Sequence, residues 1–315
     1  RFGVSTGRAN RALQLLSNRG TIIRRQRTGT VVGEGPGDDQ GYGLKRLNIV
    51  VSETPVRTEG LLDDGIMLGL QAALPGVALR QHFLPGEGAK AFIDDVVSAS
   101  LKAEGKDGFL LFRCPAVVQR VLAESGLPTV VVGGLHLSVT GVAALDRDQF
   151  QIGVELAAFA LRKECSRFVC LLREQVGPGD RRFAEGLTRT LAEAGVPLDR
   201  VVWEHIETDE GTIRATVAEH LRSSGKIAFL CRNEYLAEQT RTAILLTKSK
   251  HPACEIAMAD CYRSDPSDAP FPFPRPEWSA EEVGAKLGRL LIEQAGKRNG
   301  DRTLSETLIP VSAAI

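Results

Sequence analysis

Residues 226–247 read Lys-Ile-Ala-Phe-Leu-Cys-Arg-Asn-Glu-Tyr-Leu-Ala-Glu-Gln-Thr-Arg-Thr-Ala-Ile-Leu-Leu-Thr. The apolar run at Lys226–Cys231 has the length of a strand, and apolar residues then recur at helical spacing over Tyr235–Thr247. Because the run is apolar at consecutive rather than alternate positions, it is typical of a strand covered on both faces. The stretch therefore predicts one strand and one helix of an α/β protein with a parallel sheet.

The same unit repeats over most of the chain. Further strands are predicted at Leu47–Val51, Val77–Leu84, Gly108–Phe112, Thr129–Val132, Gly141–Leu145, Arg167–Leu172, Val201–His205, Glu255–Ala259 and Leu304–Val311. Further helices are predicted at Ala89–Ala103, Gln149–Lys163, Arg181–Ala194, Thr212–Ser223 and Ala280–Ala295. Roughly 270 residues of this pattern suit two doubly wound parallel-sheet lobes with a ligand cleft at the strand ends. A single large Rossmann-type enzyme domain is the alternative on periodicity alone.

The composition and the absence of known motifs argue against several classes of function. Of the 315 residues, 43% are hydrophobic and 25% charged, as in globular proteins, and no run has the roughly 18 apolar residues of a membrane span. The six cysteines form no C-x-x-C pair, so we expect mostly small buried side chains in a reducing cytoplasm. The sequence holds no recognisable nucleophile motif, phosphate loop or metal-ligand spacing. We therefore expect no enzymatic activity, no cofactor, no metal site and no membrane contact.

The charge is distributed unevenly along the chain. Residues 1–46 hold nine basic and three acidic side chains, so this segment carries a formal charge of +6 and the remainder −6. A small basic segment on a larger acidic body is typical of a polyanion-binding head. The alternative is an ordinary solvated arginine-rich surface.

The pattern inside the basic segment favours a DNA-binding head. Ser5 suits the N-cap of a helix that reaches Leu16, and two short β runs at Thr21–Arg25 and Thr30–Val32 follow. The four residues 26–29 between these runs predict a hairpin tip that carries Arg27. A helix N-terminus and an arginine-bearing hairpin both suit contacts with phosphates and grooves.

Residues Val4–Leu16 and 20–32 together resemble the recognition helix and wing of GntR-type bacterial transcription regulators. Asn10 stands where that family often has an arginine, and the chain opens at Arg1, inside the winged-helix unit. We therefore expect a partial winged-helix domain over residues 1–33 and a glycine-rich linker over 34–46. By position, the resemblance implies DNA contacts by Ser5, Thr6, Arg8, Arg11, Arg25, Arg27, Thr28 and Gly29.

The rest of the chain, residues 47–315, resembles the LacI-type body, which has the periplasmic-binding-protein fold of type I. The resemblance rests on the order and spacing of several strings, at residues 128–133, 142–146, 153–157, 186–195, 228–237, 256–260, 282–291 and 303–310. It implies two lobes, an effector-binding and dimerisation role, and a ligand between the lobes that is commonly a sugar.

The same resemblance implies a set of ligand-binding residues. Asn233 and Asp260 match positions that hydrogen-bond the ligand, and Asp146 lies at a crossover between the lobes. Phe183 stands where the family has a ligand-binding arginine, and Arg182 replaces that arginine if the helix begins one residue earlier. The alternative for Asn233 and Asp260 is that they only cap a helix or turn.

These patterns together predict a cytoplasmic, ligand-responsive transcription regulator, acting as a repressor. It would be a homodimer that binds operator DNA and senses a small molecule, a sugar or a sugar derivative. The alternative is a small-molecule binding protein of the periplasmic-binding-protein type that does not bind DNA.

Overall fold

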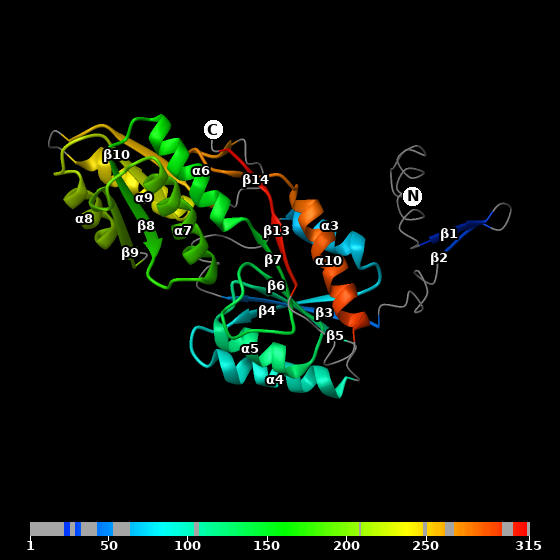
Figure 1. Ribbon diagram of the computed structural model, residues 1–315. Helices are drawn as coiled ribbons and strands as arrows, with labels where there is room; N and C mark the ends of the chain where they lie inside the picture. The colour runs from blue at the N-terminus through cyan, green and yellow to red at the C-terminus, as the bar shows by residue number, and fades with distance from the viewer. Residues whose placement is uncertain are drawn as a thin grey trace.

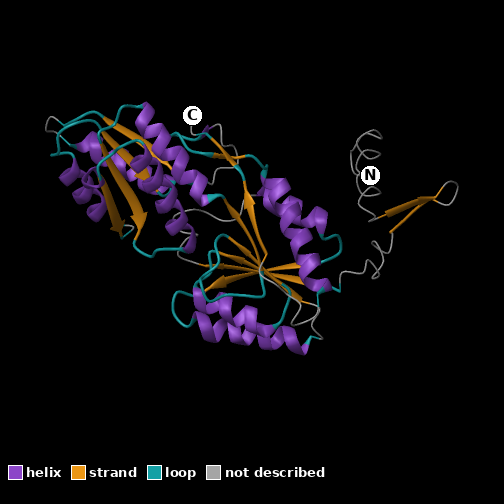
Figure 2. Cartoon of the chain, in the orientation of Figure 1, coloured by secondary structure: helices purple, strands orange, loops and turns teal. Residues whose placement is uncertain are grey.

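The computed structural model describes residues 22–25, 29–32, 43–52, 64–103, 107–207, 209–247, 251–261, 268–297 and 305–313. From residue 43 onward the chain forms two lobes, each built on a parallel β-sheet with helices on both faces (Figure 1 and Figure 2). The α/β class and the two doubly wound lobes predicted from the sequence are confirmed.

The N-terminal lobe is a six-stranded sheet in the order β13-β7-β6-β5-β3-β4, with every neighbouring pair parallel. Its strands are β3 (Arg46–Ser52), β4 (Ala78–Leu84), β5 (Asp107–Phe112), β6 (Thr129–Val132), β7 (Ala143–Arg147) and β13 (Ser305–Ile309). One face is covered by α3 (Asp64–Ala73) and α10 (Ala280–Gly296), the other by α4 (Ala89–Lys102) and α5 (Ala116–Ser125). All six residues of β5 are buried, because its side chains pack alternately into these two helical layers.

The C-terminal lobe is a four-stranded parallel sheet in the order β11-β10-β8-β9. Its strands are β8 (Arg167–Arg173), β9 (Val201–Ile206), β10 (Ile227–Cys231) and β11 (Cys254–Met258), and a 3-10 turn at Leu198–Arg200 precedes β9. Helices α6 (Gln149–Arg162) and α7 (Pro178–Glu193) cover one face, and α8 (Glu210–His220) and α9 (Glu234–Leu246) cover the other.

Helices α6 and α7 pack at very close range through two glycines. A Cβ at Gly153 would lie 2.2 Å from the carbonyl oxygen of Phe183, and one at Gly186 would lie 2.1 Å from that of Phe150. No side chain fits there, so the glycines fix how closely the two helices approach. This packing sets the position of the N-terminal turn of α7, which contributes to the site described below.

The chain passes between the lobes three times: from β7 into α6, from β11 back to α10, and from β13 to β14 (Val311–Ser312). β14 pairs antiparallel with a short strand, β12 (Arg275–Pro276), that the sequence patterns did not predict. The single predicted strand Leu304–Val311 is wrong in this respect: Pro310 has no N–H for a ladder, so β13 ends before it and β14 begins after it.

A second correction concerns α7, which begins at Pro178 and not at Arg181. Proline is well suited to the first position of a helix, because its fixed φ fits the helix and its missing N–H would have no helical partner there. The earlier start adds Pro178, Gly179 and Asp180, so Asp180 lies in the first turn of the helix.

Residues 22–25 and 29–32 of the basic segment form a β-hairpin. Strands β1 (Ile22–Arg25) and β2 (Gly29–Val32) pair antiparallel, with Arg25 opposite Gly29 at the tip. The predicted hairpin is thereby confirmed. The predicted helix and the other proposed DNA contacts, Ser5, Thr6, Arg8, Arg11, Arg27 and Thr28, lie outside the described residues.

Among the described residues, no helix is both long and apolar enough to cross a membrane. Within the same ranges, no three His, Cys, Asp or Glu side chains come together as a metal site would require. Four of the six cysteines are buried, as expected, while Cys254 and Cys261 are half-buried.

Candidate functional site

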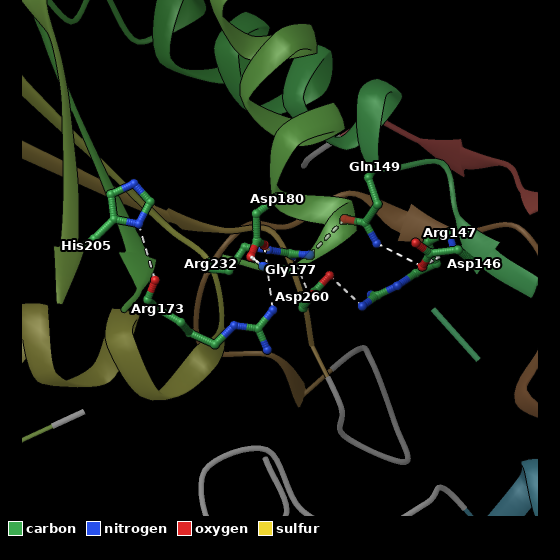
Figure 3. A network of polar contacts seen from close by, with 9 residues as sticks. All are labelled: Asp146, Arg147, Gln149, Arg173, Gly177, Asp180, His205, Arg232 and Asp260. Atoms are coloured by element: carbon green, nitrogen blue, oxygen red, sulfur yellow. Dashed lines mark hydrogen bonds and ion pairs between the residues drawn. The ribbon is translucent and has the colours of Figure 1, made fainter. Parts of the chain in front are cut away.

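The carboxyl ends of the strands of both lobes meet where the lobes join, and an arginine stands at four of these ends. Arg113 directly follows β5, Arg147 ends β7, Arg173 ends β8, and Arg232 directly follows β10. In α/β proteins this edge of the sheet is where ligands bind, because loops and helix N-termini converge there. Figure 3 shows the network that three of these arginines form with acidic side chains.

Arg232 lies at the centre of the network. Its Nε donates to Oδ1 of Asp180 and its Nη1 to Oδ2 of Asp260, both at 2.5 Å, and its Nη2 donates to Oε1 of Gln149 at 2.9 Å. The guanidinium also lies 5.7 Å from the ring centroid of Phe183. Only 4% of the Arg232 side chain is exposed, so this arginine is held by paired charges and an aromatic face rather than by water.

The two aspartates come from different segments, one from the start of α7 and the other from the residues after β11. Asp180 lies in the first turn of α7, where it also accepts from the N–H of Gly177 at 2.7 Å and lies 3.6 Å from Nη2 of Arg173. Asp260 follows β11 and forms a second ion pair with Arg147, the last residue of β7 in the N-terminal lobe. The Arg147–Asp260 pair therefore joins the two lobes directly.

Asp146 lies next to this network and is half-buried. Its Oδ1 accepts from Nε2 of Gln149 at 3.0 Å and from its neighbour's backbone N–H at 2.8 Å. Burial raises the pKa of Asp146, and the charge of Asp260 raises it further, although the hydrogen bond from Gln149 and the charges of Arg147 and Arg232 oppose the shift. The protonated form of this carboxyl is therefore favoured by the fold.

The lobes also touch at the edge of the network. A Cβ placed on Gly134, in the loop after β6, would lie 2.9 Å from Cβ of Pro178 at the start of α7. The same loop is tied down by Gln119, whose Oε1 accepts from the N–H of His136 at 3.2 Å. Nearby, Nη2 of Arg182 donates to Oε2 of Glu306 on β13 at 3.0 Å, a second ion pair between the lobes.

The structure places the four predicted ligand-binding residues in different surroundings. Asp146 and Asp260 lie close together at the network, and their role in ligand binding stays a prediction. Asn233 is buried and caps α9, with its Oδ1 accepting from the N–H of Leu236 at 2.9 Å, and its proposed role in ligand binding stays a prediction. The side chain of Arg182 is 49% exposed and pairs with Glu306, and its proposed role in ligand binding stays a prediction.

Sequence reasoning missed the central arginine. Phe183 is completely buried in the core of the C-terminal lobe, so the family's arginine position on α7 is filled by a packing residue. Arg232, which directly follows β10, instead places its guanidinium 5.7 Å from the centroid of that ring. The available signal was the string Cys-Arg-Asn at 231–233, because a charged residue at the end of a continuously apolar strand has to find partners at the sheet edge.

No family model and no curated protein matches the chain. Several solved structures share its fold at low sequence identity. A complex of the transcriptional regulator CelR with cellobiose is 17% identical, with a TM-score of 0.67, and covers 100% of this chain and 91% of its own. A probable maltose operon repressor, malR, from Staphylococcus aureus is 13% identical, with a TM-score of 0.68, and covers 88% and 97%. A LacI family regulator from Enterococcus faecium with bound ribose is 16% identical, with a TM-score of 0.64, and covers 85% and 96%.

These similarities establish the fold: the chain has the two-lobed architecture of LacI-type regulators. The three structures are described as transcription regulators, and two of them hold a sugar.

Proposed function

We propose that this protein is a ligand-responsive transcription regulator, acting as a repressor, whose body binds a sugar or a sugar derivative. The observation that carries the proposal is the polar network at the strand ends, in which charged groups of both lobes meet. The regulators with the same fold and bound sugars support the ligand class. The protein is proposed to act in the cytoplasm as a homodimer on operator DNA, without enzymatic activity.

In this proposal the chain divides into three parts. Residues 1–33 form a GntR-type DNA-binding head, residues 34–46 a linker and residues 47–315 the effector-binding and dimerisation body. The hairpin β1–β2 and the charge of +6 on residues 1–46 support the head. Its proposed DNA contacts are Ser5, Thr6, Arg8, Arg11, Arg25, Arg27, Thr28 and Gly29.

The ion pairs that join the lobes are proposed to couple ligand binding to DNA binding. Arg147 and Asp260, and separately Arg182 and Glu306, hold one relative position of the lobes. A ligand that contacts Asp146, Asp260 or Asn233 competes with or adds to these contacts, so it changes the relative stability of the open and closed arrangements. Its effect on DNA affinity is then limited by the difference between its affinities for the two arrangements.

The proposal can be tested by selecting double-stranded DNA from a random pool on the full chain. We expect an enriched sequence whose affinity falls steeply with salt, because arginine–phosphate contacts release counterions. Changing Arg8 or Arg27 to Ala should weaken binding, whereas Arg189→Ala, an exposed arginine on α7 of the body, should not. Failure to enrich any sequence, with no difference between these variants, would favour a binding protein without a DNA function.

A further inference from the structure

A buried glutamine on α5 ties together two loops of the N-terminal lobe. Gln119 is 2% exposed. Its Nε2 donates to the carbonyl oxygen of Cys114 at 3.3 Å and to that of Gly134 at 3.5 Å, and its Oε1 accepts from the N–H of His136 at 3.2 Å. A buried amide is costly unless its donors and its acceptor find partners, and here all three contacts are to loop backbone.

The loop that Gln119 holds is the β6–β7 loop, residues 133–142. It contains a turn in which the N–H of Val139 donates to the carbonyl oxygen of His136 at 2.9 Å. The side chain of Leu135 packs on the core beneath α5. The loop therefore has an apolar anchor in its own sequence, and Gln119 supplies the polar anchor on either side of it.

The β6–β7 loop also touches the C-terminal lobe. A Cβ on Gly134 would lie 2.9 Å from Cβ of Pro178 and 3.2 Å from the next backbone nitrogen, so no larger residue fits there unless the lobes shift. A second observation agrees: the pKa of His136 is lowered by burial and then by the charges of Arg120 and of Arg181, which lies on α7. The loop and the start of α7 therefore face each other.

The contacted turn of α7 holds the centre of the polar network. Pro178 is the first residue of α7, and Asp180 lies two residues further on. Asp180 accepts from the N–H of Gly177 at 2.7 Å and from Nε of Arg232 at 2.5 Å. Because Pro178 and Asp180 belong to one helical turn, a displacement of the first moves the second. A continuous path of contacts thus leads from Gln119 to Arg232.

We propose that Gln119 is a positioning residue of the lobe junction: it holds the β6–β7 loop against the first turn of α7 and so fixes Asp180 relative to Arg232. Gln119 belongs to the N-terminal lobe, whereas the groups that it positions belong to the other lobe. The inference deepens the proposed function, and it rests on that function only for its consequence, that the position of Asp180 matters to the effector.

The alternative is that Gln119 only stabilises its own lobe, and α5 offers a comparison that separates the two roles. Ser125 lies near the other end of the same helix. Its Oγ donates to the carbonyl oxygen of Leu122 at 2.8 Å and accepts from the N–H of Leu127 at 3.2 Å. Ser125 and Gln119 both brace a loop beside α5, but the loop braced by Ser125 leads into the beginning of β6, at the opposite edge of the sheet from the lobe junction.

The test measures hydrogen–deuterium exchange of the full chain by mass spectrometry, without ligand or DNA. Gln119→Met keeps the volume of the side chain but loses its amide. We expect about tenfold faster exchange at residues 134–139, the loss of one hydrogen bond of ordinary strength. The decisive readout is in the other lobe, where exchange at residues 177–183 should rise by about threefold or more. Ser125→Ala is the matched control and should leave residues 177–183 as in the parent.

A second variant tests the same contact from the C-terminal lobe and does not depend on the folding of Gln119→Met. Because a coupling free energy is reciprocal, Pro178→Gly should speed exchange at residues 134–136 by about twofold or more. Unchanged exchange there overturns the inference. So does a Gln119→Met protein in which the loop loosens but residues 177–183 exchange as in the parent or as in Ser125→Ala. Neither readout uses DNA or an effector, so a failure of the proposed function would leave the result standing.

Discussion

Two arginine–aspartate clusters lie at opposite ends of the N-terminal sheet. One cluster lies within a single lobe, and the other includes residues of both lobes. At the beginnings of β3 and β5, Nε of Arg46 donates to Asp107 at 3.0 Å, and Nδ2 of Asn48 donates to the same carboxylate at 3.2 Å. The cluster is balanced, with one arginine for one aspartate, and it belongs to a single sheet. It is explained fully by the stability of that lobe.

The cluster at the strand ends has three arginines and reaches into both lobes. Its members come from β7, β8, α6, α7 and the segments after β10 and β11, so no single element determines it. The comparison shows that an arginine–aspartate pair is not by itself a sign of function. The useful sign is that the cluster takes its members from both lobes.

Among the substitutions that compare the two clusters, Arg232→Ala should have the largest effect on the free energy of unfolding. This change leaves Asp180 and Asp260 buried without their main cation, and removing one partner of a buried pair costs about 3–5 kcal/mol. We expect a clear fall in the free energy of unfolding, measured by urea denaturation. A loss below about 1 kcal/mol would show that Arg147 and Arg173 alone can balance the aspartates.

A smaller loss is expected from Asp107→Asn in the balanced cluster, about 1–2 kcal/mol, because Arg46 is 30% exposed and can be solvated. Burial tends to raise the pKa of Asp107, but hydrogen bonds from Arg46, Ser100 and Asn48 outweigh it and hold the pKa below its usual range. The ionised form therefore stabilises the fold above a pH of about 4, and this contribution is lost as the pH falls through the lowered pKa. Unfolding measured from pH 3 to 7 should show the variant and parent converging at the acidic end.

At the lobe junction, Asp146→Asn is expected to raise the stability of the folded state, whereas Asp107→Asn lowers it. A raised pKa means that ionising Asp146 destabilises the folded state at a pH above the unfolded value of about 3.9. The variant should therefore be more stable than the parent at pH 7, by about 1 kcal/mol or less, and the gain should disappear below pH 4. A variant that is less stable at neutral pH would indicate that the ionised carboxylate is held by Arg147 and Arg232.

The smallest effect on stability is expected from Gly134→Ala. Its Cβ would lie 2.9 Å from Cβ of Pro178, so the two lobes must shift by a few tenths of an ångström. We expect a change in folding stability within about 0.5 kcal/mol but a measurable loss of effector affinity. Gly133→Ala is no suitable control, because Gly133 has φ of 107°. An exposed change elsewhere, such as Gln175→Ala, serves instead.

Much of the fold could be predicted because continuous apolar strands and amphipathic helices are local signals. Thr129–Val132 was predicted to the residue, and most other strands differ by one or two positions. The break at Pro310 and the short strand β12 depend on pairing between distant segments, which periodicity does not encode. The beginning of α7 was misplaced because Pro178 and Gly179 read as a loop when only the sequence is considered.

The candidate site was predicted only in part. Asp146 and Asp260 were found because a family pattern pointed to them, and both lie in the network. Arg232 was missed because its role depends on the buried ring of Phe183, which is 49 positions away in the sequence and adjacent only in the folded C-terminal lobe. The contact of Arg182 with Glu306 on β13 could not be predicted either, because the two residues are far apart in the sequence and meet only in the fold.

The position of β13 in the sequence affects the order in which the two lobes can fold during synthesis. The strands and helices of the C-terminal lobe sheet come from one stretch, residues 149–258, whereas the first lobe acquires α10 and its edge strand β13 only from residues 280–309, which are synthesised later. During translation the second lobe can thus fold before the first is complete. A nascent chain that stops short of Ser305 would expose the unpaired side of β7, an edge that invites association with other chains.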